Sequence, residues 1–223
     1  MTQPLPPLPI RIVKLPVDHR GFPVPWFVQW FKDGEPTSYG DGEPDFRVID
    51  ARKIPVAVNQ NRCWVCGETM GVHKAFVIGP MCAINRIISE PPSHLDCAIF
   101  SATACPFLTR PRMRRNEKDL PEQGVPAAGL HIDRNPGVMC VWVTRSYKPF
   151  RPHAGNAGVL FALGEPERTI WYTQGREATR AEVMVAIESG YPLLQDMAER
   201  EGREAIAALA QQRDRAMPLL PAG

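Results

Sequence analysis

Two close pairs of metal-binding residue types constrain this chain more than any other feature. The first pair is Cys63-Trp-Val-Cys66, followed at once by Gly67, and the second is His94-Leu-Asp-Cys97. Zn²⁺ accepts a tetrahedral set of thiolates and imidazoles, and a CxxC turn can supply two of these ligands. Gly67 favours a metal-binding turn over the strand-then-helix context of a redox motif. The two pairs therefore predict a single zinc site.

The residues before the second pair indicate how it reaches the first. Pro91, Pro92 and Ser93 form a helix start, with Ser93 as the expected N-cap residue. His94 and Cys97 are three residues apart and would share one face of the first helical turn, where the helix dipole favours a thiolate. Four protein ligands close a zinc site, so we expect structural rather than catalytic zinc.

Two further cysteines are alternatives to His94 as the fourth ligand. Cys82 follows Gly79-Pro80, the turn of a short hairpin predicted from residue 75 onwards. Cys105 would lie 11 residues from His94 in one helix. At 1.5 Å per residue this is about 16 Å, too far to share an ion unless the helix ends early.

A metal-binding turn at 63–66, a short hairpin and a helix whose first turn closes the site resemble a treble-clef zinc finger. The resemblance covers roughly residues 60–108, about a fifth of the chain, and the 27 residues between the ligand pairs exceed the spacing of the commonest fingers. It implies structural zinc and binding to nucleic acids or proteins. The same stretch also looks like an uncharacterised family of bacterial and phage proteins, which implies no particular function.

Proline content predicts short elements, because 24 of the 223 residues are proline, about twice the average share of ~5%. The expected fold class is α+β, with a treble-clef-like finger between short β-rich segments and a C-terminal helical region. The expected segments are an extended proline-rich arm (1–20), a β-rich segment (21–60), the zinc-finger segment (61–109), a basic linker (110–128), a β-sheet segment (129–175) and the helical region (176–223).

Apolar runs rich in aromatic and β-branched residues predict the strands. They lie at 25–31, 46–50, 54–58 and 138–144. Cys140, inside the last of these runs, is expected to be a buried thiol. Two more runs, at 159–163 and 169–173, flank a Gly-Glu-Pro-Glu turn and predict a hairpin.

The C-terminal region is predicted to be helical. Thr179-Arg-Ala-Glu182 matches a capping box, in which the two side chains satisfy free amides at a helix start. We expect this helix to stop at Gly190, a second to begin near Leu193, and a third to cover 205–217.

The run Arg110-Pro-Arg-Met-Arg-Arg115 is the strongest sign of a partner. Arginine forks match phosphate geometry, and such clusters give salt-dependent nucleic-acid affinity. We therefore expect a zinc-stabilised, non-catalytic binding protein, with nucleic acid favoured over protein as partner. The contacts would come from Arg110, Arg112, Arg114 and Arg115. Residues 177–205 hold seven acidic and three basic residues, which argues against a DNA-binding face there.

Two other functions remain open. A metal-dependent nuclease would need a catalytic histidine near the finger, and His73, with Asn85 as a helper, is the candidate. The zinc could instead hold together a structural or assembly protein. The sequence contains no GxSxG, GxxxxGK[ST] or HExxH motif that would indicate another enzyme class.

Composition narrows the setting but not the function. A net charge of +2 is too close to neutrality to indicate a partner. No apolar run approaches the roughly 20 residues that span a bilayer, and the N-terminus lacks a signal-peptide pattern. We expect a cytoplasmic protein that does not enter membranes, and nothing indicates its oligomeric state.

Overall fold

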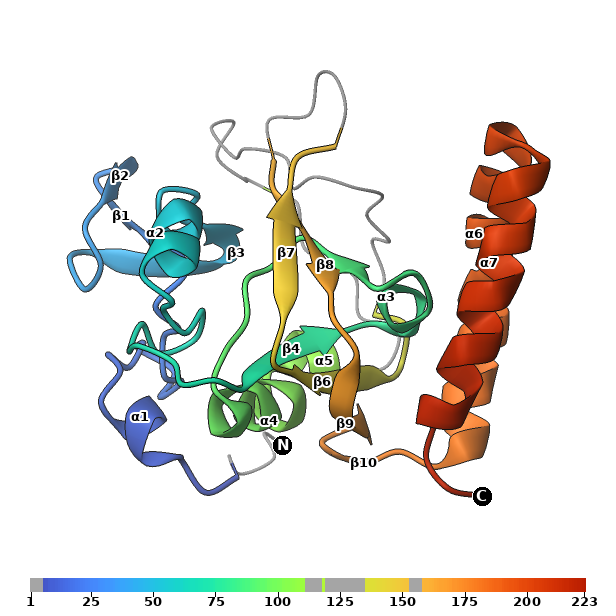
Figure 1. Cartoon of the computed structure of the whole chain (residues 1–223). Coiled ribbons are helices and arrows are strands. Elements are labelled where there is room, and N and C mark those ends of the chain that lie inside the picture. Colours follow the sequence, from blue (N-terminus) through green and yellow to red (C-terminus); the bar gives the residue numbers. More distant parts are fainter. Residues whose placement is uncertain (1–5, 111–117, 119–134, 153–157) are drawn as a thin grey trace.

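The structure, a computed structural model, describes residues 6–110, 118, 135–152 and 158–223. The predicted α+β class is confirmed: small antiparallel sheets alternate with short helices, and a helical hairpin stands at one side (Figure 1). The strands are β1 (Val28–Lys32), β2 (Glu35–Thr37), β3 (Glu43–Ile49), β4 (Lys74–Ile78), β5 (Ile87–Ile88), β6 (Met139–Thr144), β7 (Tyr147–Phe150), β8 (Leu160–Leu163), β9 (Pro166–Thr173) and β10 (Arg176–Glu177). The helices are α1 (Ile10–Val13), α2 (Lys53–Asn59), α3 (Pro80–Asn85), α4 (Leu95–Ala104), α5 (Pro106–Thr109), α6 (Arg180–Glu201) and α7 (Arg203–Ala216), followed by the 3₁₀ turn η1 (Met217–Leu219).

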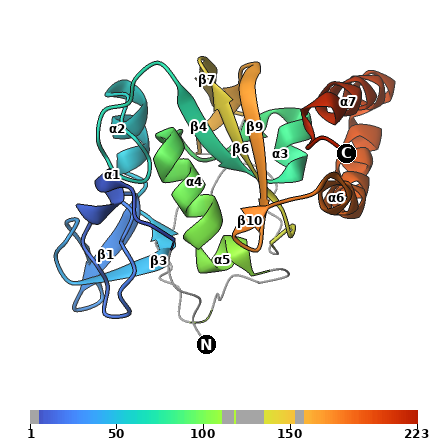
Figure 2. The ribbon, with the colours of Figure 1, turned by 90° about the horizontal axis from the view of Figure 1, so that it is seen from below.

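A four-stranded sheet with the order β10-β9-β6-β4 forms the centre of the molecule. Every residue of β6 is buried because both faces of the sheet are covered. Val141 and Val143 pack with Ala98 and Ala102 of α4 on one face. Trp142, on the opposite face, belongs to the larger core formed with α3, α6 and α7 (Figure 2).

The predicted hairpin between 159–163 and 169–173 is wrong. Both runs are strands, but β8 pairs with β5 and β7, whereas β9 pairs with β6 and β10. The amide of Gly164 donates to the carbonyl of Ser146 at 3.0 Å, and the hydroxyl of Thr144 donates to the carbonyl of Glu165 at 2.8 Å. These bonds tie the connection to the end of β6, so the chain crosses between sheets instead of reversing.

Residues 54–58, predicted as a strand, lie instead in the helix α2. Pro55 is compatible with this because it falls in the first helical turn, where backbone amides have no intrahelical partner. Ala57, within this helix, is buried. An apolar run of five residues does not distinguish a strand from a buried helix by its pattern alone.

The capping box at the start of α6 is confirmed, since the amide of Glu182 donates to the Thr179 hydroxyl and the amide of Thr179 donates to the Glu182 carboxylate. The predicted stop at Gly190 is wrong, because α6 continues to Glu201 and the tail holds two long helices rather than three. A Cβ at Gly190 would lie 3.1 Å from the side chain of Met81, so this glycine allows α6 to approach α3. Among the described residues, no helix is both long and apolar enough to cross a membrane.

Candidate metal centre

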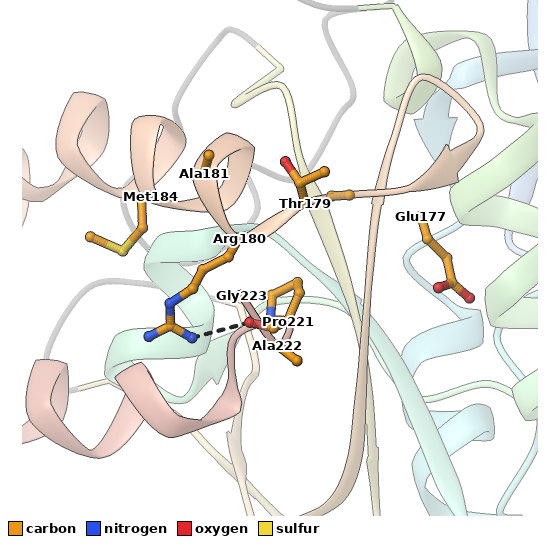
Figure 3. Close-up of a pocket in the computed structure, with 9 residues that line it drawn as sticks. Glu177, Thr179, Arg180, Ala181, Met184, Pro221, Ala222 and Gly223 are labelled. Carbon is orange, nitrogen blue, oxygen red and sulfur yellow. Dashed lines mark hydrogen bonds between the residues drawn. The ribbon is translucent and has the colours of Figure 1, made fainter.

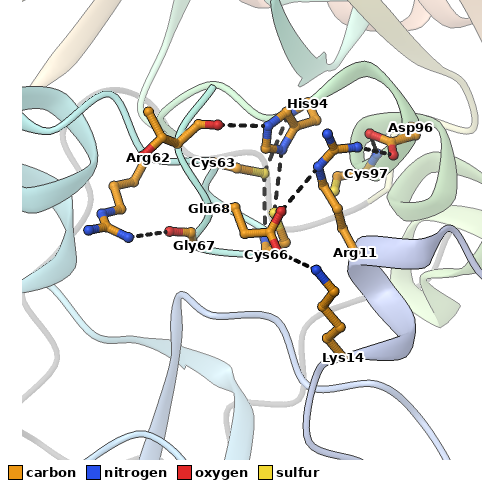
Figure 4. A network of polar contacts seen from close by, with 11 residues as sticks. Arg11, Lys14, Arg62, Cys63, Cys66, Gly67, Glu68, His94, Asp96 and Cys97 are labelled. Atoms are coloured by element: carbon orange, nitrogen blue, oxygen red, sulfur yellow. Dashed lines mark hydrogen bonds and ion pairs between the residues drawn. The ribbon is translucent and has the colours of Figure 1, made fainter. Parts of the chain in front are cut away.

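Two segments that are distant in sequence bring four donor atoms together (Figure 4). Cys63, Cys66, His94 and Cys97 each offer one ligand atom, and these atoms all lie within 4.8 Å of one another. Cys63 and Cys97 are completely buried, whereas Cys66 and His94 are half-buried. The two pairs singled out by their spacing therefore meet in the fold.

A tight turn presents the first pair. The amide of Gly67 donates to the carbonyl of Cys63 at 2.8 Å, and the amide of Cys66 points at the Cys63 sulfur, 3.4 Å away. Gly67 has a φ of +73°, and an added Cβ would lie 2.8 Å from the ring of Trp26. Both the backbone conformation and the close aromatic neighbour require glycine at this position.

The second pair lies at the start of α4. His94, not Ser93, occupies the N-cap position, and its side chain does not cap the helix. Ser93 instead exchanges two backbone hydrogen bonds with Ala75 of β4, at 2.9 and 2.7 Å. The amide of Trp64, within the first turn, donates to the carbonyl of Pro92 at 3.0 Å. The backbone thus holds the second pair against both the sheet and the first pair.

The histidine ring is oriented for coordination. Nδ1 of His94 lies 3.4 Å from Sγ of Cys66, and Nε2 lies 3.2 Å from the carbonyl oxygen of Thr69. A carbonyl only accepts, so Nε2 carries the proton and the Nδ1 lone pair faces the cysteines. An acceptor on the far nitrogen of a ligating histidine fixes its tautomer in this way.

Three neighbouring thiols cannot all ionise without a cation. Burial disfavours the Cys63 thiolate, but hydrogen bonds from the thiols of Cys66 and Cys97 and from two backbone amides outweigh it and lower the pKa of Cys63. The hydrogen bond to Cys63 raises the pKa of Cys66 to about 11, and the pKa of Cys97 is raised as well. A divalent cation would favour the thiolate at all three positions.

The donor set fits a soft or borderline divalent metal ion. Tetrahedral coordination with Zn–S bonds of about 2.3 Å separates the sulfurs by about 3.8 Å, which is compatible with donor atoms inside a 4.8 Å limit. Thiolate and imidazole ligands together select zinc and similar metals over magnesium or calcium.

The other cysteines lie apart from this cluster. Gly79 and Pro80 do not form the predicted hairpin turn: they begin α3, and Cys82 lies within that helix. Cys105 follows α4 at the end opposite the cluster. Neither joins the group of donors found in the described part of the chain. Cys140 is a completely buried thiol in β6, as predicted.

The N-terminal segment also contributes to the centre, and the prediction that it is an extended arm is wrong for residues 10–13. These form α1, and Ile12 is buried against the cluster. Arg11 contacts Asp96 and Glu68, and Lys14 contacts Glu68 (Figure 4). No local pattern in the sequence indicates this network, because its members come from three separate segments.

The two candidate nuclease residues contact different partners. His73 Nε2 lies 3.1 Å from a Glu167 carboxylate oxygen, and Glu167 also pairs with Arg145. Asn85 accepts a hydrogen bond from the amide of Ile87 beyond α3. The whole of β4, about 17 Å at 3.4 Å per residue, lies between His73 and the start of α3.

The arginine run is described only at its first member. Arg110 is exposed just after α5, and its carbonyl accepts a hydrogen bond from the Asn135 side chain at 2.9 Å. Arg112, Arg114 and Arg115 lie outside the described residues.

A cavity of about 850 Å³ lies between the start of α6 and the C-terminal residues (Figure 3). Its charged lining residues are Glu177 and Arg180, and Arg180 donates to the carbonyls of Pro221 and Met217. The Arg180 guanidinium is thus engaged by the protein's own C-terminal residues.

Comparison of the chain with protein-family models, with curated proteins and with solved structures yields no match.

Proposed function

We propose that this chain is a zinc-stabilised, non-catalytic binding protein whose Zn²⁺ is held by Cys63, Cys66, His94 and Cys97. The observation that carries the proposal is the meeting of four protein donors, two of them completely buried. Four protein ligands leave no open position for water or substrate, as is typical of structural zinc.

The surrounding elements support a treble-clef-like arrangement. A tight turn carries the first ligand pair, β4 pairs with Ser93, and α4 begins at the second pair. The segment 79–90, which contains α3 and β5, separates β4 in sequence from Ser93, the residue with which β4 pairs. This insertion accounts for the unusually long separation of the ligand pairs.

Nucleic acid is the proposed partner, and the arginine run is the proposed contact. Four arginines fall within residues 110–115. Arg110 is exposed, and α5 connects it directly to α4, whose first turn carries two of the proposed ligands. A phosphate backbone bound here would thus be connected to the metal centre through α4 and α5.

The metal is tested on protein purified without added metal. We expect about one zinc per chain by mass spectrometry, and its loss in Cys63→Ser and Cys97→Ser but not in Cys140→Ser. Wild-type protein without zinc would contradict the proposal.

The partner is tested by fluorescence anisotropy with single- and double-stranded oligonucleotides over a salt series. Replacing Arg112, Arg114 and Arg115 by glutamine should reduce the salt slope by about three, because each arginine–phosphate contact contributes roughly one. The matched control replaces three exposed arginines of the helical region, Arg200, Arg203 and Arg215, by glutamine. Unchanged binding would rule out this contact surface, and cleavage abolished by His73→Ala would favour a nuclease instead.

A further inference from the structure

A metal ion bound by the four donors would link the segment that carries Cys63 and Cys66 to the segment that carries His94 and Cys97. Arg11 also contacts both of these segments, through side chains beside the donors. Glu68 follows the first ligand pair, whereas Asp96 lies between the two ligands of the second. Nη1 of Arg11 donates to Asp96 Oδ2 at 2.9 Å, and its Nε lies 3.3 Å from Glu68 Oε2 (Figure 4). One side chain therefore spans both halves of the site.

The helix that carries Arg11, α1, depends for its stability on packing against the cluster that contains Cys63 and Cys97. α1 has four residues, whereas an isolated helix needs roughly 12–15 to be even marginally stable in water. Ile12 is 1% exposed and belongs to the same apolar cluster as Cys63 and Cys97. Packing on the metal centre is thus what keeps α1 in place.

Charge gives Arg11 a second role. Three thiolates and a neutral imidazole around a divalent cation carry a net charge of about −1. Glu68 and Asp96 add two negative charges beside it. The planar guanidinium can face both carboxylates at once, which an ammonium group cannot do with the same geometry.

We infer that Arg11 is a positioning residue of the metal centre, which holds the two ligand pairs together by bridging Glu68 and Asp96 and couples the docking of α1 to metal binding. The inference rests on the proposed metal function. Lys14 provides the matched comparison, because its ion pair in the described part of the chain is with Glu68 alone, at 3.0 Å, and its side chain is 62% exposed.

The first test measures the transfer of Zn²⁺ from the full chain to an excess of a colorimetric chelator. Arg11→Met should release Zn²⁺ at least about tenfold faster than wild type, because outer-sphere partners change metal affinity by roughly 10–100-fold. Arg11→Lys should recover part of the loss, since it keeps the charge but not the fork. Lys14→Met should change release by no more than about twofold, as expected of an exposed ion pair.

The second test needs no variant. Trypsin cleaves after Arg11 and Lys14, so these bonds should be protected in zinc-loaded wild-type protein and cut rapidly after chelation. Cleavage after Arg200, at the end of α6, should not change and serves as the internal control. Equal release from wild type and Arg11→Met, or equal protection of α1 with and without zinc, would overturn the inference while leaving the metal site intact. Wild-type protein that binds no zinc would overturn the proposed function as well.

Discussion

Cys97 and Cys140 are both completely buried, yet they belong to regions held together in different ways. Cys97 lies among the donors of the candidate metal centre and the small apolar cluster of Ile12, Val65 and Met70, which we call the metal region. Cys140 lies in the core that β6 and β9 form with α3, α6 and α7, which we call the apolar region. The burial of a cysteine therefore does not reveal its role; its neighbours do.

The two regions also differ in how much apolar surface they bury. Trp142, Phe76 and Phe161 are completely or almost completely buried in the apolar region, and the Trp142 indole donates to the carbonyl of Gly164 at 3.1 Å. The metal region has no aromatic residue in the buried part of its cluster among the described residues. Trp64, between Cys63 and Cys66, is 2% exposed but stacks on Phe27, outside this cluster. An apolar cluster this small contributes little stability on its own, so we expect metal coordination and ion pairs to supply much of it.

Removing the metal should give the largest effect and should separate the two regions. Structural zinc contributes about 10–16 kcal/mol in small zinc-finger peptides, so its loss by chelation or in Cys97→Ala should unfold the metal region. Hydrogen exchange monitored by mass spectrometry should show lost protection at residues 63–70 and 93–97, with β6 and β9 still protected. Uniform loss or uniform retention would refute the comparison.

Trp142→Ala tests the converse. Removing this side chain should lower the free energy of unfolding by about 3–5 kcal/mol through the lost burial and the cavity left behind. Urea unfolding measures the change, and the zinc content of the folded protein should equal that of wild type. If Trp142→Ala also lost zinc, the metal region and the apolar region would have to fold and unfold together.

Alkaline pH should weaken the apolar region by a smaller amount. Burial raises the pKa of Cys140, so the folded state keeps this thiol protonated where the unfolded chain ionises it. That stability is fully present below about pH 8.5 and is lost as pH rises, by up to about 1.4 kcal/mol per pH unit. Cys140→Ala should flatten this loss in unfolding curves.

The metal region should respond to the opposite change in pH. As pH falls, protons compete with the metal for its thiolates, so we expect zinc to be released.

The donor cluster could be predicted from sequence because each ligand pair is local and its chemistry is specific. Cys63 and Cys66 share one turn, and His94 and Cys97 share one helix start. The pairing of strands could not be predicted in this way. β4 pairs with β6, and the two strands together present apolar side chains to the α4 side of the sheet and to the α3 side. Only the assembled core determines that arrangement.

Single residues show the same limit. A glycine in a helical pattern indicates a stop by local rules, but Gly190 serves the contact between α6 and Met81. Arg11 lies on a proline-rich segment without any pattern, and only the fold brings it near the two acidic residues that it contacts, Glu68 and Asp96. Local signals therefore indicated the four clustered donors but not the charged residues that the fold places beside them.

The order of these regions along the chain matters while the protein is being made. All four donors precede Ala98, whereas the apolar region requires β6, β9, α6 and finally α7, which ends at Ala216. Translation delivers the N-terminal part first. We therefore expect the nascent chain to be able to bind a metal ion while β4 still lacks its neighbour β6. Metal available during synthesis would allow the metal region to fold before the apolar region is complete.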